Sequence, residues 1–117
     1  MIAKGKIKSG DIVWTEFDPS IGHEYQRKRP AIVVQSNQQL TKSNLVTIIP
    51  LTSKMENNIN DDILVRADSQ NNLMADSLAK VYCLTSFDYC RFEKIIGQID
   101  KATTSKIKEY LKIHFDF

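Results

Sequence analysis

The sequence has little of what metal centres and disulfide frameworks are made from, with only two cysteines and two histidines in 117 residues. Cys83 and Cys90 lack the spacing of a zinc knuckle or a redox pair, and His23 and His114 add no convincing transition-metal site. We therefore expect no metal and no other cofactor. So few cysteines fit a reducing, cytoplasmic setting.

Long apolar runs are also missing. The N-terminal run Met1-Ile2-Ala3-Lys4-Gly5-Lys6 is not followed by an apolar segment of signal-peptide length. No uninterrupted apolar stretch approaches the roughly 20 residues that cross a bilayer, so we expect a soluble protein without a membrane partner. The three prolines and four glycines form no linker, and no internal repeat is visible. This predicts a single domain over residues 1–117.

No strong charge of one sign is present either, because 16 basic residues oppose 14 acidic ones. A net charge of +2 does not by itself indicate a nucleic-acid partner. A local cluster of Lys and Arg can nevertheless attract phosphates in a nearly neutral protein. The position of the cations therefore carries more information than their total.

Several short segments rich in strand formers, with turn residues between them, predict a compact antiparallel barrel of five to six strands. They are residues 12–17, 31–35, 45–49, 63–65, 77–84 and 94–99. Pro50 cannot donate to a ladder and is expected at a strand end or edge. Trp14 is interpreted as core or dimer-interface filler in preference to a nucleotide-stacking residue.

The end of the chain predicts one amphipathic helix packed on the barrel. The side chains at helical intervals are Ile107, Tyr110, Leu111, His114 and Phe115. Asp100 or Thr103 is expected to cap the start of this helix. His114 is interpreted as a partly buried helix residue rather than a catalytic one.

The most informative segment is Gly22-His23-Glu24-Tyr25-Gln26-Arg27-Lys28-Arg29-Pro30, which combines three cations with a carboxylate, an imidazole and a phenol. Pro30 biases Arg29 towards an extended backbone where the next strand begins. Arg29 is thus expected at the mouth of the sheet, with Arg27 and Lys28 on the preceding loop. A basic loop is more often a solvated turn, so this pattern alone does not identify an enzyme.

Internal cleavage of RNA needs little apparatus, because the substrate's own 2′-hydroxyl is the nucleophile. The protein must accept a proton, stabilise the charged phosphorane and assist the departing 5′-oxygen. Arginine suits the second task, since its planar fork binds phosphate oxygens and keeps its charge. Thr52 and Ser53 follow the apolar strand at residues 45–49 and are well placed if the two strands are neighbours.

In combination these motifs resemble the MazF/PemK toxin family. Gly10-Asp11-Ile12-Val13-Trp14 with Phe17-Asp18-Pro19 is similar to its opening strand, and Gly22-His23-Glu24 with Arg29-Pro30-Ala31-Ile32-Val33-Val34 to its signature loop and second strand. Ile48-Ile49-Pro50-Leu51-Thr52-Ser53 resembles the third strand. The run Ser77-Leu78-Ala79-Lys80-Val81 and the closing helix extend the match over essentially the whole chain.

The resemblance implies an SH3-like barrel and a homodimeric toxin that cleaves single-stranded RNA sequence-selectively, leaving 2′,3′-cyclic phosphate and 5′-hydroxyl ends. It assigns Arg29 and Thr52 as the catalytic pair. Glu24 matches the loop carboxylate that orients Arg29 or contacts bases, and His23, Arg27, Lys28 and Ser53 are further expected RNA contacts. A cognate antitoxin with an acidic tail is the implied protein partner.

The sequence departs from the family pattern at Cys83-Leu84-Thr85-Ser86, where a Gln and an Arg are expected. This departure keeps open a degenerate member that binds RNA or antitoxin without cleavage. A non-catalytic toxin that traps DNA gyrase on the same barrel is the other alternative. Arg29 and Thr52 favour the nuclease, because the gyrase-directed relatives lack that pattern.

Overall fold

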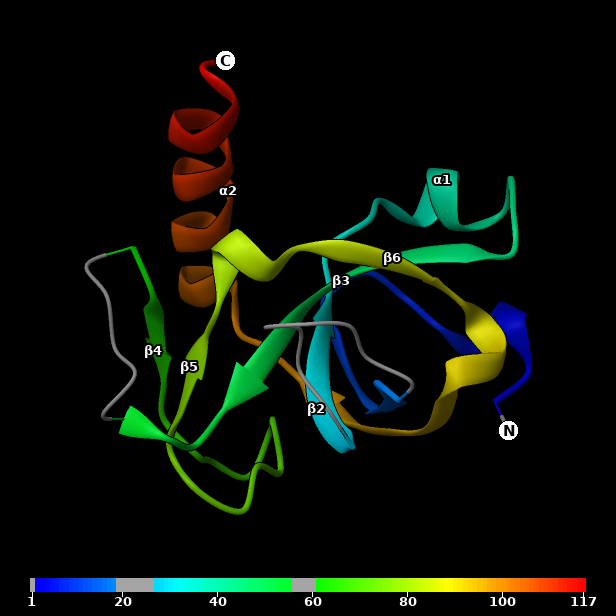
Figure 1. Cartoon of the computed structure of the whole chain (residues 1–117), viewed down its shortest axis with the longest axis horizontal. Helices are drawn as coiled ribbons and strands as arrows, with labels where there is room; N and C mark the ends of the chain where they lie inside the picture. The colour runs from blue at the N-terminus through cyan, green and yellow to red at the C-terminus, as the bar shows by residue number, and fades with distance from the viewer. Residues whose placement is uncertain (1, 19–26, 56–60) are drawn as a thin grey trace.

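The computed structural model describes residues 2–18, 27–55 and 61–117, and in that part of the chain seven strands form one antiparallel sheet. The order is β4-β5-β3-β2-β1-β7, with β6 paired to β3 off this path (Figure 1). The strands are β1 (Asp11–Glu16), β2 (Lys28–Val33), β3 (Leu45–Thr52), β4 (Ile63–Val65), β5 (Ser77–Ala79), β6 (Thr85–Asp88) and β7 (Phe92–Gln98). The mainly β, barrel-like prediction is confirmed, with one strand more than expected.

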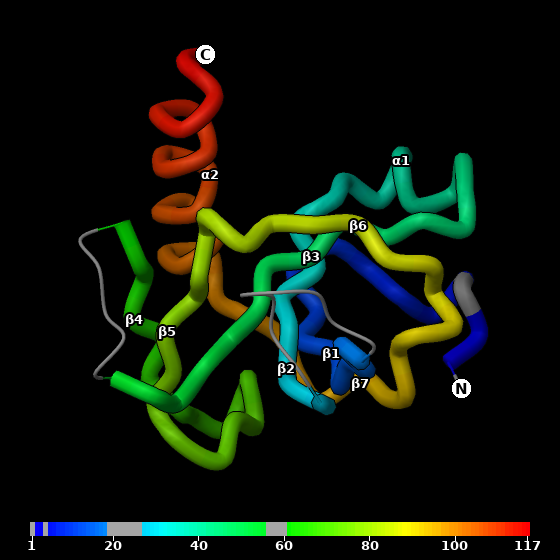
Figure 2. Tube along the Cα trace, in the orientation of Figure 1, coloured from blue at the N-terminus to red at the C-terminus, as the bar shows by residue number. Residues whose placement is uncertain are grey.

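The missed strand is β6, because residues 77–84 were read as one continuous strand. That segment instead contains the short β5 and then a 3-10 helix, η3 (Val81–Cys83). Cys83 was predicted to lie in a strand and lies in this helix instead. Other short helices in the described residues are η1 (Lys4–Lys6), α1 (Asn37–Leu40) and η4 (Tyr89–Arg91). η3 separates β5, which pairs with the last residues of β3, from β6, which pairs with its first residues. Both strands run antiparallel to β3 (Figure 2).

The three central strands bury side chains on both faces, since each face packs on a core of its own. Ile12, Ile32 and Ile49 lie opposite one another and belong to the first core, together with Ile107 of the C-terminal helix. Val13 and its neighbours on the other face belong to the second. Burying an aliphatic side chain of this size contributes roughly 1.5–3 kcal/mol, so both cores oppose a shift in strand pairing.

Pro50 lies inside β3 and is buried, which corrects the prediction that it would end a strand or lie at an edge. On one side β3 pairs with β2; on the other it pairs first with β6, up to Ile48, and then with β5, from Leu51. Pro50 falls between these two partners, and its carbonyl accepts the Lys80 N–H at 3.0 Å. A missing donor is tolerated there because neither ladder needs it.

The C-terminal helix α2 (Lys101–Phe115) begins where Asp100 accepts the Thr103 N–H at 2.8 Å, a bond that also holds the pKa of the Asp100 carboxyl below its usual value. Ile107 is buried, whereas His114 and Phe115 are exposed, contrary to the expected apolar face. The last turns project beyond β4 and β5 (Figure 1), so they have no sheet beneath them. Across the described ranges no helix combines the length and apolar character needed to cross a bilayer.

The segment after β4 folds back over β7, and Gly97 permits this approach. Asp68 and Asn71 hold the segment's shape, as Asp68 accepts the Asn71 N–H at 2.7 Å and Asn71 donates to the Arg66 carbonyl at 2.8 Å. The Gln98 N–H then donates to the Gln70 carbonyl at 3.1 Å. A Cβ on Gly97 would stand 2.5 Å from backbone oxygens of this segment, so only glycine fits.

We predict that Gly97→Ala destabilises the fold by about 1–3 kcal/mol, because rigid backbone rather than a pliable side chain opposes the added methyl. Gly5→Ala is the matched control, since a Cβ there meets nothing within 4 Å. Urea unfolding of both variants measures the difference. Equal midpoints for the two variants would contradict the close approach at Gly97.

Candidate functional site

The pairing of β2 with β3 leads to Arg29 and Thr52. Ala31 lies opposite Pro50, and the antiparallel count advances one residue on each strand in opposite directions. The paired positions end there: Arg29 lies two residues before Ala31 in β2, and Thr52 lies two residues after Pro50 in β3. The condition stated from the sequence, that these two strands are neighbours, is therefore met. The two candidate residues lie at the same end of these strands, where β2 begins and β3 ends.

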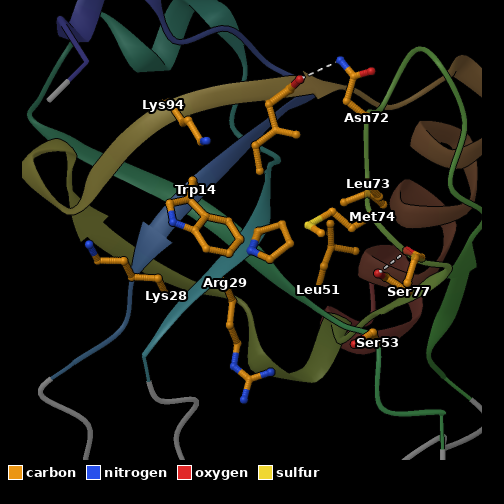
Figure 3. A pocket seen from close by; sticks show the side chains of 13 residues that line it. Trp14, Lys28, Arg29, Leu51, Ser53, Asn72, Leu73, Met74, Ser77 and Lys94 are labelled. Atoms are coloured by element: carbon orange, nitrogen blue, oxygen red, sulfur yellow. Dashed lines mark hydrogen bonds between the residues drawn. The ribbon is translucent and has the colours of Figure 1, made fainter.

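Arg29 is the second residue of β2 and is half-buried. It lies opposite Thr15 of β1, a fully buried residue, so its backbone is held by the central sheet as Pro30 led us to expect. In Figure 3 the guanidinium extends away from Trp14 and Met74, out from the end of the strand. A cation fixed at its stem and extended at its tip is suited to meeting a phosphate.

Thr52 is the last residue of β3, and its side chain is 2% exposed. Its Oγ1 accepts the Lys54 N–H at 3.2 Å, which orients the hydroxyl. Because the oxygen accepts this bond, the hydroxyl keeps its own proton for donation. Thr52 is thus positioned on both sides, by strand pairing with Leu78 and by the turn that follows.

Lys28 lies in the sheet and not on the preceding loop, which corrects the sequence prediction. It is the first residue of β2, opposite Glu16, and its Nζ is 2.6 Å from Glu93 on β7. The hydrogen bond to Glu93 raises the pKa of Lys28 above its usual value, so the ammonium stays charged at neutral pH. Glu93 also neutralises part of that charge at long range. Lys28 therefore forms an ion pair that links β2 to β7.

Arg27 is exposed and lies just before β2, with a positive φ of 66°. Its carbonyl accepts the Phe17 N–H at 2.8 Å, which closes the base of the connection between β1 and β2. Arg27 thus stands on the connecting segment, as expected. His23 and Glu24, the other expected RNA contacts in this connection, lie outside the described residues.

A groove of about 450 Å³ opens beside Arg29 (Figure 3). Side chains on one face of β1, β2 and β7 form one wall, and residues 72–75 form the other. The lining consists of Trp14, Lys28, Arg29, Pro30, Leu51, Ser53, Asn72, Leu73, Met74, Ala75, Ser77, Lys94 and Ile96. Ser53 is exposed and lines the same groove as Arg29, and its role as an RNA contact stays a prediction.

Trp14 and Lys94 are among the lining residues that were not predicted as site residues. Trp14 was interpreted as core or dimer-interface filler. It is half-buried and belongs to neither core, so the core interpretation is wrong and the dimer-interface one stays a prediction. Lys94 lies directly opposite Trp14 on β7 and is exposed. The missed signal is register: once β7 is aligned with β1, residues at alternate positions on both strands share the groove face.

Asp61 and Asp62, which precede β4, are held by side chains from the segment after β5. Lys80 donates to Asp62, whose side chain is 0% exposed, and the Tyr82 hydroxyl donates to Asp61. The hydrogen bond to Asp61 raises the pKa of Tyr82. Lys80 in turn donates its backbone N–H to Pro50 in β3. The buried ion pair therefore links the strand that carries Thr52 to the segment that follows it.

The cysteines take no part in this arrangement. Cys83 is half-buried, and burial raises the pKa of its thiol, while the exposed Cys90 has its pKa raised by a hydrogen bond to Asp88. Both thiols are less acidic than usual, the opposite of what a nucleophilic cysteine requires. Within the described ranges no group of three or more His, Cys, Asp or Glu residues is arranged to hold a metal.

An open barrel-like sheet with a C-terminal helix and a basic groove at its end defines a class seen in known proteins. The structure superposes on MazF from Deinococcus radiodurans with a TM-score of 0.81, at 20% identity and 95% and 97% coverage of the two chains. A mycobacterial endoribonuclease solved with its cognate antitoxin gives a TM-score of 0.73 at 14% identity, covering 95% of this chain and 94% of the other. These likenesses establish the fold.

Similarity in sequence identifies the family within this fold class. Endoribonuclease MazF9 of Mycobacterium tuberculosis is 28% identical over 115 residues, which cover 94% of this chain and 97% of the relative. The toxin MazF of Escherichia coli is 24% identical over 81 residues, 69% and 73% of the two chains. The model of the PemK-like, MazF-like toxins of type II toxin-antitoxin systems matches residues 8–115. The chain belongs to that toxin family.

We predict that Lys80→Ala costs about 3–5 kcal/mol of stability, because it leaves the Asp62 carboxylate buried without that ammonium. Lys112→Ala is the matched control. Lys112 and Glu109 are 3.9 Å apart and both largely exposed, so its loss should cost less than about 1 kcal/mol. Denaturant unfolding at neutral pH compares the two. A Lys80 variant as stable as the control would show that the buried pair adds nothing.

Proposed function

We propose that this protein is the toxin of a toxin-antitoxin pair and acts in the cytoplasm as a sequence-selective endoribonuclease on single-stranded RNA. In this proposal no metal takes part in cleavage. The observation that carries it is that Arg29 and Thr52 lie at the same end of two neighbouring antiparallel strands, where Arg29 lines a groove together with Lys28 and Lys94. Membership of a toxin family whose relatives include named endoribonucleases supports it.

In the proposed reaction the 2′-oxygen of the substrate attacks the adjacent phosphorus. A new O2′–P bond forms as the P–O5′ bond breaks, which leaves a 2′,3′-cyclic phosphate and a 5′-hydroxyl. The 2′-proton passes to a base, and the departing 5′-oxygen gains a proton. Arg29 stabilises the charge that develops on the phosphorane. Its pKa, above about 12 in general, suits electrostatic work better than proton transfer.

Thr52 is proposed to donate its hydroxyl proton in a hydrogen bond to a phosphoryl oxygen. The bond from Lys54 to its Oγ1 supports this role, since it aims the hydroxyl before substrate arrives. Ser53, exposed in the groove, is proposed to contact the RNA backbone. Glu24 is proposed to orient Arg29 or contact bases, with His23, Arg27 and Lys28 as further RNA contacts.

The cognate antitoxin is proposed to bind the same cations through an acidic tail. Lys28, Arg29 and Lys94 line the groove, and no acidic side chain stands among its described lining residues. A flexible acidic segment would be attracted by the same field as RNA and would block it. Solved relatives in complex with an antitoxin support this part of the proposal.

A homodimer is proposed as well. Large apolar side chains gather on the projecting end of α2, where Ile113 is 72% exposed, Phe115 48% and Phe117 92%. Tyr82 packs edge-on against His114, which packs against Phe115, so aromatic rings continue this apolar surface to η3. Exposed apolar clusters of this kind mark protein interfaces, and a second copy of the chain is the proposed occupant.

The nuclease is tested by incubating the purified protein, free of antitoxin and with EDTA, with a long single-stranded RNA and mapping the fragment ends. We expect discrete fragments with 5′-hydroxyl ends. Arg29→Ala should lower the cleavage rate by about 10²- to 10³-fold, as loss of a charge-stabilising donor does. Thr52→Ala should also be impaired, whereas Thr52→Ser keeps the hydroxyl and should retain activity.

Arg66→Ala is the control for loss of an exposed arginine, since Arg66 does not line the groove. Cleavage that survives in Arg29→Ala, or that requires a metal, would overturn the proposed mechanism. Intact RNA with folded protein would favour a binding-only member or a gyrase-directed toxin. Growth inhibition that persists in cells expressing Arg29→Ala would then identify the gyrase-directed alternative.

The dimer is tested by placing a charge in the exposed apolar surface of α2. Ile113→Glu is expected to shift the protein towards the monomer, because a carboxylate would have to be desolvated at the interface. Lys108→Glu, an exposed change on the same helix, is the control. Light scattering over a concentration series measures the mass. Identical masses for both variants would place the contact between copies elsewhere.

A further inference from the structure

The floor of the groove is formed by residues that lie side by side across three strands. Trp14 of β1 is flanked by Pro30 on β2 and by Lys94 on β7, each its direct partner in the ladder. Their side chains therefore share one face of the sheet. Because Trp14 belongs to neither core and is half-buried, its indole offers surface to whatever occupies the groove.

The opposite wall is a segment fixed in place rather than a free loop. Asn72, at a φ of 54°, donates its side-chain amide to the Ile96 carbonyl at 2.9 Å, and Gly97 admits the preceding backbone against β7. This anchoring holds Met74, which is fully exposed. In Figure 3 the Met74 side chain reaches from its segment towards the Trp14 side of the groove. An indole and a thioether thus face one another across the groove.

The charge of the groove favours one kind of occupant. Lys94 and Lys28 stand on the Trp14 side, and Arg29 extends from the same end of the sheet (Figure 3). Cations around an aromatic surface are what single-stranded nucleic acid meets in its binding sites, where bases stack on rings and phosphates meet basic side chains. The apolar floor alone would suit many ligands, but the surrounding cations select an anionic one with flat apolar parts.

We propose that Trp14 is a base-stacking residue, on which a base of the RNA next to the scissile phosphate lies, with Met74 across from it. This inference rests on the proposed nuclease function and adds a substrate contact to it. Trp14 lies opposite Pro30, the immediate neighbour of Arg29, so the stacked base and the phosphate held by Arg29 occupy adjacent positions. Lys94 meets the phosphate on the far side of that base.

The chain offers a direct readout, because Trp14 is its only tryptophan. The probe is an oligoribonucleotide that contains the mapped cleavage sequence, with the 2′-hydroxyl at the cut replaced by hydrogen so that it binds without reacting. Saturable quenching of tryptophan fluorescence is expected. The same oligonucleotide with an abasic residue beside the cut should still bind, by anisotropy of an attached dye, but should quench much less.

Kinetics on the unmodified oligonucleotide supply the second measurement. Trp14→Leu keeps an apolar side chain but cannot stack, so KM should rise about 10- to 100-fold with kcat little changed. Trp14→Phe keeps an aromatic face and should restore most of the affinity. Urea unfolding of both variants checks the fold. The fluorescence test uses the unsubstituted protein, so it stands even if a variant is unstable.

The outcomes separate this inference from the function on which it rests. Cleavage by the unsubstituted protein without quenching, or with an unchanged KM in Trp14→Leu, overturns the stacking role and leaves the nuclease standing. Quenching by a long single-stranded RNA that the protein does not cleave retains base stacking on Trp14 and rejects the nuclease. Fluorescence that responds to dimer dissociation or to an acidic peptide, but not to RNA, overturns the proposal and assigns the groove to a protein partner.

Discussion

The register between β2 and β3 is the constraint on which the other features of the molecule depend. Ala31 lies opposite Pro50, and this pairing sets Arg29 and Thr52 at the same end of the two strands. A slip of one residue would turn every side chain of a strand to the other face. Both faces are buried here, with Ile32 and Ile49 in one core and Val33 and Ile48 in the other. A slip would therefore disrupt two cores at once, which fixes the positions of Arg29 and Thr52 along their strands.

Because side chains alternate along each strand, the two faces of the sheet carry different groups. Trp14, Pro30 and Leu51 occupy one face by register, and Thr15, Arg29 and Thr52 occupy the other. The base-binding groove and the pair proposed to act on phosphate thus meet at one edge from opposite sides. An RNA strand presents bases and phosphates in different directions, so a substrate that crosses this edge can satisfy both. Residues adjacent in sequence are enough to build such a site, because neighbouring positions on a strand point in opposite directions.

The sequence predicted the fold class, the central strands and the capped helix, since each has a periodic or capping signal of its own. It misplaced features set by tertiary partners. Pro50 sits inside β3 only because the strand changes neighbours there, and Lys28 is held in β2 by Glu93 from a distant strand. The exposure of His114 likewise reflects how far the sheet extends under α2. Arg29 and Thr52 were identified by resemblance, whereas Trp14 was assigned to a core because a lone tryptophan carries no sign of which face it occupies.

The segment Cys83-Leu84-Thr85-Ser86, where the resemblance leads one to expect a Gln and an Arg, has a structural task in this chain. Thr85 and Ser86 begin β6 and pair with Ile48 and Thr47 of β3, and the hydroxyls of Ser86 and Thr47 are 2.7 Å apart. The segment thus supports the edge of the strand that ends in Thr52. Cations that contact RNA must then come from other strands, and the groove shows them on β2 and β7. Attraction to phosphate depends on distance and not on position in the chain, so moving basic side chains from one strand to its neighbours preserves that attraction. The same move changes which bases lie beside a cation. On this argument the departure alters the recognised sequence more than it weakens binding.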